Sequence, residues 1–278
     1  MNEEFIIIDG IKIRYLVSGH GPPILLVHGL GEFLEIWTSN ITGLSQGFTV
    51  YAMDLPGHGL SEKTDEDYTF GFSVNFVAKF IKAVGLGKVN LIGHSLGGAI
   101  CLGFTMNFPD KVDNLILTSS GGFTNEIPLS YRLVKLPILA NILLGPTFLI
   151  NRATIGVGVK RQFYNPDTAP EDWFEIVSRH LKMPGRKATI RNIVKSNTNI
   201  PGIESSITNS NLFPLVEQPT LIVHGKQDKL IHVENTRSTK NLIPHASLKV
   251  LDECGHHPQI EKAEEFNGLV LSFLTPVK

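Results

Sequence analysis

One glycine-rich stretch of the sequence has the residue types and spacing of a nucleophilic serine site. Gly93-His94-Ser95-Leu96-Gly97-Gly98 follows the apolar run Val89–Ile92 and precedes a second apolar segment, Ala99–Phe108. A G-x-S-x-G motif between a strand and a helix places the serine on a sharp, strained turn, which neighbouring glycines allow because they lack Cβ atoms. The Ser95 Oγ would project from the end of the sheet, and the Leu96 N–H would face a developing oxyanion. The alternative is an ordinary turn in which Ser95 caps the helix.

A serine at neutral pH needs a neighbouring base, and that base needs an acid to orient it. The sequence offers two adjacent histidines, His256 and His257, and an aspartate, Asp228, in a short polar loop after the apolar run Thr220–Val223. The histidine pair could instead suggest metal binding, but no H-E-x-x-H or Cys/His spacing accompanies it, so we expect no metal site. No G-x-G-x-x-G motif follows the first apolar runs, and a dinucleotide site is not expected either.

Composition excludes several other classes of protein. The 278 residues carry 25 basic and 26 acidic side chains, a net charge of −1, without the basic excess that nucleic-acid binding requires. The hydrophobic content of 42% argues against disorder, and two cysteines, Cys101 and Cys254, are too few for a disulfide framework. The acidic start and the interrupted apolar tract Leu133–Ile150 predict neither a secretion signal nor a membrane span. We therefore expect a cytoplasmic protein that acts on a small molecule, with neither nucleic acid nor membrane as a partner.

The elements that must position the reactive residues alternate between strand and helix patterns. Phe5–Ile8 and Ile11–Val17 flank Asp9-Gly10, whose tendency toward positive φ predicts a hairpin. Apolar residues at 72, 76, 80 and 84 mark one face of a helix. The order predicts an α/β fold with a mostly parallel sheet covered by helices on both faces. Apolar runs typical of its buried strands lie at 23–27, 49–53, 89–92, 115–118, 220–223 and 248–251.

The alternation stops between about Phe123 and Asn211. This span contains helical-looking apolar segments, several Pro and Gly residues and no clear buried strand. We expect a helical insertion over one end of the sheet, so that residues 1–122 and 212–278 form the core and residues 123–211 form a cap. The only charges between Ile127 and Gly158 are basic, and an alternative is that this part lies on a membrane surface, as a lipase lid does.

Five motifs follow one another along the chain: His28-Gly29-Leu30-Gly31, Asp54–Ser61, the Ser95 turn, His224–Asp228 and Cys254-Gly255-His256. In this order they make the sequence resemble the α/β-hydrolase superfamily over nearly the whole chain outside the cap. The resemblance is to the branch of serine esterases and carbon–carbon hydrolases that carry a helical cap. It implies the α/β-hydrolase fold and a catalytic triad in the chain order Ser, acid, His.

The resemblance also implies roles for individual residues. Ser95 corresponds to the nucleophile, Asp228 to the acid, and His256, which directly follows a glycine, to the base. The backbone N–H groups of Leu30 and Leu96 correspond to the oxyanion hole. The candidate residues of the substrate pocket are Gly29, His94 and His257, the last of which would line the entrance or pack on the cap.

The function that this site implies is acyl transfer by a serine hydrolase without a cofactor. We expect a monomer or homodimer that cleaves a carboxylic ester or thioester with an apolar group, because the cap is rich in leucine. Related dehalogenases and epoxide hydrolases carry aspartate in place of Ser95. Carbon–carbon hydrolases of meta-cleavage products are an alternative, although they typically have Arg before a cap Trp and Trp after the catalytic His. This chain has Glu171-Asp172 before Trp173, and His257 after His256. A ligand-binding protein that kept the fold is a further alternative.

Overall fold

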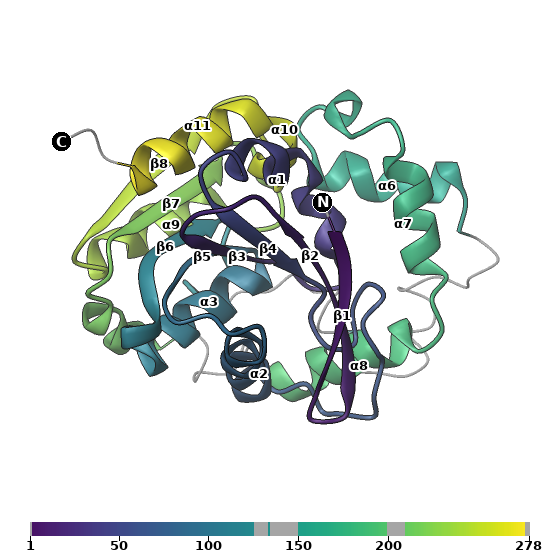
Figure 1. Ribbon diagram of the computed structural model, residues 1–278. Helices are drawn as coiled ribbons and strands as arrows, with labels where there is room; N and C mark the ends of the chain where they lie inside the picture. Colours follow the sequence, from purple (N-terminus) through teal and green to yellow (C-terminus); the bar gives the residue numbers. More distant parts are fainter. Residues whose placement is uncertain (1, 125–132, 134–149, 199–208, 276–278) are drawn as a thin grey trace.

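The computed structural model describes residues 2–124, 133, 150–198 and 209–275, which form one eight-stranded sheet with helices around it (Figure 1). The strands lie in the order β1-β2-β4-β3-β5-β6-β7-β8. β1 (Asn2–Ile8) and β2 (Ile11–Ser18) form the expected hairpin, in which Asp9 and Gly10 have φ values of 51° and 82°. β2 pairs antiparallel with β4 as well, and the remaining strand pairs are parallel.

The parallel strands carry the site residues at their carboxyl ends. Every residue of β5 and β7 is buried, which explains why these sequences are largely apolar rather than alternating. β8 lies at the edge of the sheet, and its residues alternate in exposure. Because the carboxyl ends of parallel strands share one edge, the loops after β5, β7 and β8 meet there. These strands are β3 (Pro23–Val27), β4 (Thr49–Met53), β5 (Val89–His94), β6 (Val112–Thr118), β7 (Thr220–Gly225) and β8 (Ala246–Leu251).

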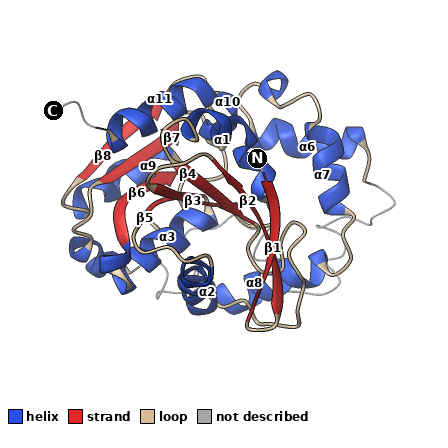
Figure 2. Cartoon of the chain, in the orientation of Figure 1, coloured by secondary structure: helices blue, strands red, loops and turns tan. Residues whose placement is uncertain are grey.

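Two hydrophobic clusters cover the two faces of the sheet, and Figure 2 shows helices on both sides of the strands. Leu25 and Val27 of β3 belong to one cluster, with α2 (Phe70–Ala83) and α3 (Leu96–Asn107). Ile24 and Leu26 belong to the other, with the 3₁₀ helix η1 (Leu34–Trp37), α1 (Thr38–Leu44) and α11 (Ala263–Leu274). The alternation along β3 is the period of two that a strand covered on both faces requires. This arrangement confirms the predicted α/β-hydrolase fold class. The remaining α-helices described in the core are α9 (Val233–Thr239) and α10 (Pro258–Glu261).

Among the described residues between β6 and β7, where the sequence predicts an insertion, there are three α-helices: α6 (Arg152–Gln162), α7 (Trp173–Leu181) and α8 (Arg186–Asn197). Figure 1 shows α6 and α7, in teal and green, on the side of the molecule opposite the C-terminus. Most of the span Ile127–Gly158, on which the lipase-lid hypothesis depends, lies outside the described residues. Among the helices that are described, none is long and apolar enough to cross a membrane.

Candidate active site

Ser95 occupies a strained turn between β5 and α3. Its φ of 53° and ψ of −119° form a backbone conformation that non-glycine residues rarely adopt. The turn needs glycine on both sides of the serine. A Cβ on Gly93 would lie 2.4 Å from the Gly97 carbonyl oxygen, and a Cβ on Gly97 would lie 2.4 Å from the His28 carbonyl oxygen. The glycines of the motif therefore let β3, β5 and α3 approach closely enough to present Ser95 at the sheet edge.

His256 and Asp228 form a chain of hydrogen bonds with Ser95. His256 Nε2 lies 3.1 Å from Ser95 Oγ, and His256 Nδ1 lies 2.8 Å from Asp228 Oδ2. The other carboxylate oxygen, Oδ1, accepts the N–H groups of Leu230 at 2.8 Å and Ile231 at 3.0 Å. The loops after β5, β7 and β8 thus bring the three predicted residues together in the order Ser95, His256 and Asp228, which is the geometry that a catalytic triad requires.

The Asp228 carboxyl is held in its ionised form. Burial would raise its pKa, but the charge of His256 and hydrogen bonds with His224 and His256 lower the pKa well below its ordinary value. An ionised Asp228 accepts the Nδ1–H of His256, which leaves the Nε2 lone pair facing the Ser95 hydroxyl. In this tautomer His256 can remove the Ser95 proton.

The two predicted oxyanion donors, the N–H groups of Leu30 and Leu96, lie on the segments that flank Ser95. Leu96 is the first residue of α3, so its N–H has no acceptor within the helix. Gly29, which precedes Leu30, is so close to Ser95 that a Cβ there would lie 2.9 Å from Ser95 Cβ. Within the described part of the chain, neither N–H takes part in a hydrogen bond. Such donors can stabilise the negative charge that develops on a carbonyl oxygen.

The histidines predicted to border the pocket are buried. His94 and His257 have exposed fractions of 0% and 1%. His94 Nε2 lies 2.8 Å from the carbonyl oxygen of His256, so His94 contacts the loop that carries the base. The His257 ring lies against Phe163, with 5.0 Å between ring centroids. His257 therefore contacts the segment between β6 and β7, where the cap is predicted.

Glu32 is not among the predicted site residues, yet it lies between three of them. Its Oε2 accepts the Gly29 N–H at 2.7 Å and lies 2.9 Å from His94 Nδ1, and its Oε1 lies 3.7 Å from His257 Nε2. Ligand atoms of Glu32, His94 and His257 all lie within 4.8 Å of one another, so these are the described side chains best placed to hold a metal ion. A hydrogen bond already joins two of the three. The one signal in the sequence is a carboxylate directly after the predicted oxyanion motif.

Glu261 is a second buried carboxylate that the motifs do not reveal. Its Oε1 accepts the Gly255 N–H at 2.9 Å, and its Oε2 accepts the Tyr164 N–H at 2.7 Å. The pKa of Glu261 is raised because the side chain is buried. In addition, the His256 N–H donates to the Gln162 carbonyl oxygen at 2.6 Å. These bonds join the loop of the base to the end of α6.

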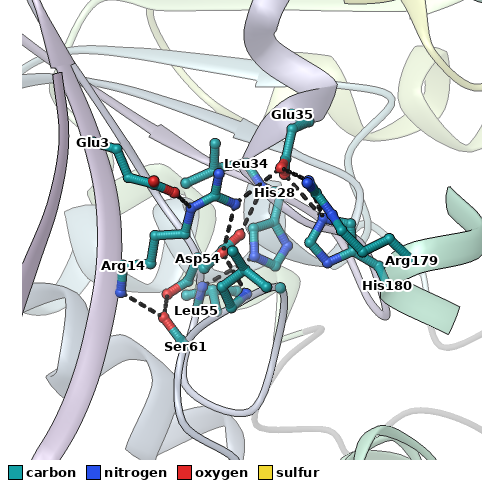
Figure 3. A network of polar contacts seen from close by, with 12 residues as sticks. Glu3, Arg14, His28, Leu34, Glu35, Asp54, Leu55, Ser61, Arg179 and His180 are labelled. Atoms are coloured by element: carbon teal, nitrogen blue, oxygen red, sulfur yellow. Dashed lines mark hydrogen bonds and ion pairs between the residues drawn. The ribbon is translucent and has the colours of Figure 1, made fainter. Parts of the chain in front are cut away.

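A separate polar network surrounds the Asp54 turn and extends to α7 (Figure 3). Asp54 Oδ1 accepts the Leu34 N–H at 2.7 Å, and Oδ2 accepts the Leu60 N–H at 2.8 Å. Arg14 Nη1 lies 3.4 Å from Asp54 Oδ2 and 3.0 Å from Glu35 Oε1. The Asp54 carboxylate is therefore used to hold backbone and Arg14, and it is not available to Ser95.

A small cavity of about 10 Å³ lies next to Leu96 and has mostly apolar walls. This volume is about that of one water molecule, so a substrate group would need neighbouring side chains to move apart. The residues that line it come from the Asp54 turn, α2, α3 and α8: Leu55, Pro56, His58, Tyr68, Phe70, Ser73, Leu96, Ile100, Ile193 and Asn197.

Comparisons with known proteins agree with this architecture. The family model described as "alpha/beta hydrolase fold" matches residues 22–144 and 160–263. The chain is 30% identical to a 2-hydroxy-6-oxo-6-(2'-aminophenyl)hexa-2,4-dienoic acid hydrolase of Metapseudomonas resinovorans, over 98% of this chain and 91% of that protein. It is similar to the solved structure of a serine hydrolase involved in carbazole degradation, at 28% identity and a TM-score of 0.83 over 98% of each chain. A thermophilic esterase from Thermogutta terrifontis, 20% identical, has the same fold with a TM-score of 0.78 over 99% of this chain and 98% of that one.

Proposed function

The chain belongs to the alpha/beta hydrolase fold family, and from that premise we propose that it is a serine hydrolase that cleaves carboxylic esters through an acyl-enzyme. The observation that carries this proposal is the hydrogen-bonded chain from Ser95 Oγ through His256 to Asp228, at 3.1 Å and 2.8 Å. A serine joined to a histidine that is oriented by a buried carboxylate is the arrangement that activates a hydroxyl nucleophile.

The proposed reaction proceeds in two half-reactions. His256 Nε2 takes the Ser95 proton as Oγ attacks the ester carbonyl, and the oxyanion accepts hydrogen bonds from the N–H groups of Leu30 and Leu96. Asp228 stabilises the imidazolium that forms. His256 then donates its proton to the departing alcohol, which leaves the acyl group on Ser95. Water, activated by His256, hydrolyses the acyl-enzyme and regenerates the serine.

An apolar substrate group fits the surroundings of the nucleophile. Phe70, Ile100 and Ile193 line the cavity next to Leu96, and an acyl chain there would exchange water for apolar contact. We also propose that residues 123–211 act as a cap over this end of the site. The contacts of His256 and His257 with Gln162 at the end of α6 support this proposal, because Gln162 belongs to the predicted insertion.

The proposal is tested by turnover of p-nitrophenyl acetate and butyrate. We expect the wild type to hydrolyse both esters, with a preference for butyrate, and Ser95→Ala to lose activity by about 10³-fold or more. The matched control is Ser238→Ala, at an exposed position on α9, which should retain wild-type turnover. Ester hydrolysis that persists in Ser95→Ala would contradict the assignment.

Carbon–carbon bond hydrolysis is the second candidate, because the 30% identical relative is named for cleavage of a 2-hydroxy-6-oxo-dienoic acid. The residues that weaken it are Glu171-Asp172 before Trp173 and His257 after His256, where the resemblance leads us to expect Arg and Trp. Offering a 2-hydroxy-6-oxo-6-phenylhexa-2,4-dienoate beside the esters separates the two functions. A kcat/KM for the dienoate far above that for p-nitrophenyl butyrate would replace the ester proposal with this one.

A further inference from the structure

A single carboxylate, Glu32, is connected to all three segments that carry the proposed catalytic groups. Its Oε2 accepts the N–H of Gly29, next to the proposed oxyanion donor Leu30. The same oxygen lies 2.9 Å from Nδ1 of His94, which directly precedes Ser95. The other nitrogen of that ring, Nε2, lies 2.8 Å from the carbonyl oxygen of His256. These three bonds link the oxyanion loop, the nucleophile turn and the loop of the base.

The partners of His94 require a proton on both of its ring nitrogens. A backbone carbonyl can only accept, so Nε2 must donate to the His256 oxygen. Nδ1 faces Oε2 of Glu32, and an ionised carboxylate can only accept, so Nδ1 donates as well. A neutral imidazole carries one N–H, and only the imidazolium form can satisfy both acceptors. His94 is therefore a buried cation whose counter-ion is the Glu32 carboxylate.

The electrostatics of the two groups agree with this protonation. Burial would raise the pKa of Glu32, but the charge of His94 and its hydrogen bond lower the pKa far below the ordinary value. Burial would lower the pKa of His94, but the charge of Glu32 and its hydrogen bond raise it. Burial lowers the pKa of the neighbouring His257 well below its ordinary value, so His257 stays neutral. The charge of Glu32 is thus balanced by His94, and metal binding would have to break a hydrogen bond already made.

We propose that the Glu32–His94 ion pair is a positioning clamp, which sets the spacing of the oxyanion loop, Ser95 and His256 in the serine hydrolase proposed above. Neither residue reacts with the substrate. The bonds of the pair reach Gly29, which is next to Leu30, and the backbone carbonyl of His256, while His94 itself is next to Ser95. Losing the pair would therefore move the proposed reacting groups relative to one another. A misplacement of about 1 Å is enough to slow an enzyme by about 10²-fold.

The isosteric substitution Glu32→Gln removes the negative charge of the side chain and keeps its size and shape. The amide oxygen can still accept from Gly29 and from a neutral His94 Nδ1–H, so the side chain remains in place. Without the carboxylate the imidazolium is no longer stabilised, Nε2 loses its proton, and the carbonyl of His256 loses its donor. Glu32→Asp keeps the charge with a shorter reach, and it should restore part of what Gln loses.

The kinetic test uses p-nitrophenyl butyrate. We expect Glu32→Gln to lower kcat by about 10- to 100-fold while KM changes by less than about threefold, with Glu32→Asp in between. Glu217→Gln, an exposed carboxylate, is the matched control and should match the wild type. In a double-mutant cycle with His94→Gln, the double variant should be no slower than the slower single variant. Wild-type kcat in Glu32→Gln, or losses that multiply in the double variant, would overturn the clamp.

A second measurement does not depend on activity. In ¹⁵N-histidine-labelled protein carrying Ser95→Ala, we expect His94 to show two ring N–H resonances at pH 8, and Glu32→Gln to abolish one of them. A single ring N–H from His94 at that pH would overturn the ion pair. The two proposals fail separately: persistent turnover in Ser95→Ala rejects the serine hydrolase, while Ser95-dependent turnover that Glu32→Gln leaves unchanged rejects only the clamp.

Discussion

At the scale of single residues, the glycines of the site are as specific as its reactive groups. Gly29 is the clearest case, because a Cβ at this position would lie 2.7 Å from Glu32 Oε2 and 2.9 Å from Ser95 Cβ. Both neighbours belong to the site, and real Cβ atoms do not approach so closely. Glycine here permits the loop of the proposed oxyanion donor Leu30 to approach Ser95 closely.

Gly29→Ala should therefore damage catalysis more than stability. The added methyl group would push the loop that carries the Leu30 N–H away from Ser95, and we expect kcat/KM for p-nitrophenyl butyrate to fall by at least about 10-fold. The matched control is Gly268→Ala on α11, where a Cβ meets nothing within 4 Å. That control should keep full activity and gain slightly in thermal stability, because alanine favours helix. Equal activity of the two variants would contradict the close approach at Gly29.

Asp228→Asn should abolish most activity with little change in shape. The amide oxygen can take the place of Oδ1 and accept the Leu230 and Ile231 N–H groups. An NH₂ group then faces His256 Nδ1, which forces the proton onto Nε2, where it faces Ser95 and leaves no base. We expect kcat to fall by about 10³- to 10⁴-fold. Asp113→Asn, at an exposed position on β6, is the control, and steady-state kinetics together with circular dichroism would show whether the loss is chemical or structural.

The proposed reactive residues are predictable from sequence because each lies in a local motif, whereas the residues that support them are not. Ser95 and His256 follow recognisable glycine patterns after apolar runs. Glu32 acquires its role only when β5 brings His94 beside it, 62 positions along the chain. Glu261 likewise bonds to Tyr164, 97 positions away. No short window of sequence contains such pairs, so the sequence predicts the proposed triad but not the carboxylates that hold it.

At the scale of elements, strand centres are predictable and strand ends are less so. The expected runs at 23–27 and 49–53 coincide with β3 and β4. β6 begins at Val112, three residues before the expected run, because the polar Asp113 and Asn114 still continue the strand beside β5. β8 begins at Ala246, two residues before the expected run. Its residues alternate in exposure at the sheet edge, so its first residues do not form a continuous apolar run in the sequence. Backbone pairing, which ignores side-chain polarity, decides these ends.

Glu35 contacts residues of two other elements, and its ionisation makes the stability of the fold depend on pH (Figure 3). It lies on η1, 3.0 Å from Arg14 on β2, and 2.7 Å and 3.3 Å from Arg179 and His180 on α7. Burial would raise its pKa, but hydrogen bonding to His180 and the charge of Arg14 lower it from 4.5 to about 2. The pKa of Glu35 is thus lower in the folded state than in the unfolded state. The ionised carboxylate therefore stabilises the fold at pH values above its unfolded pKa, and this stability is lost as the pH falls through its folded pKa.

We therefore expect the difference in unfolding free energy between the wild type and Glu35→Gln to depend on pH. It should be constant above about pH 5.5 and shrink between pH 4.5 and 2, with a pH-dependent part of about 3 kcal/mol. Urea unfolding at pH 7, 4.5 and 3 measures it, and groups that titrate equally in both proteins cancel. Glu175→Gln, an exposed residue on α7, serves as the control. A difference that stays the same at all three pH values would show that the Glu35 carboxylate does not carry this stability.

At the scale of the whole molecule, helices between β6 and β7 share a core with the sheet. Ile155 and Val159 of α6 and Trp173 of α7 belong to the same buried cluster as Trp37 and Phe266, beneath η1 and α11. Trp173 also lies 5.8 Å, between ring centroids, from Phe33 at the start of η1. α6 and α7 thus bury apolar side chains in the same core as the sheet, so their stability depends on it.

This shared core predicts one cooperative unfolding transition, and the two tryptophans of the chain are placed to test it. Trp173→Phe leaves Trp37 as the reporter of the sheet domain, and Trp37→Phe leaves Trp173 as the reporter of the insertion. In each variant we expect the fluorescence midpoint in urea to coincide with the midpoint by far-ultraviolet circular dichroism, because two-state unfolding makes different probes agree. The circular dichroism midpoint of each variant corrects for any stability lost by the substitution itself. A Trp173 transition at lower urea than the circular dichroism transition would instead mean that the predicted cap at 123–211 unfolds as a domain of its own.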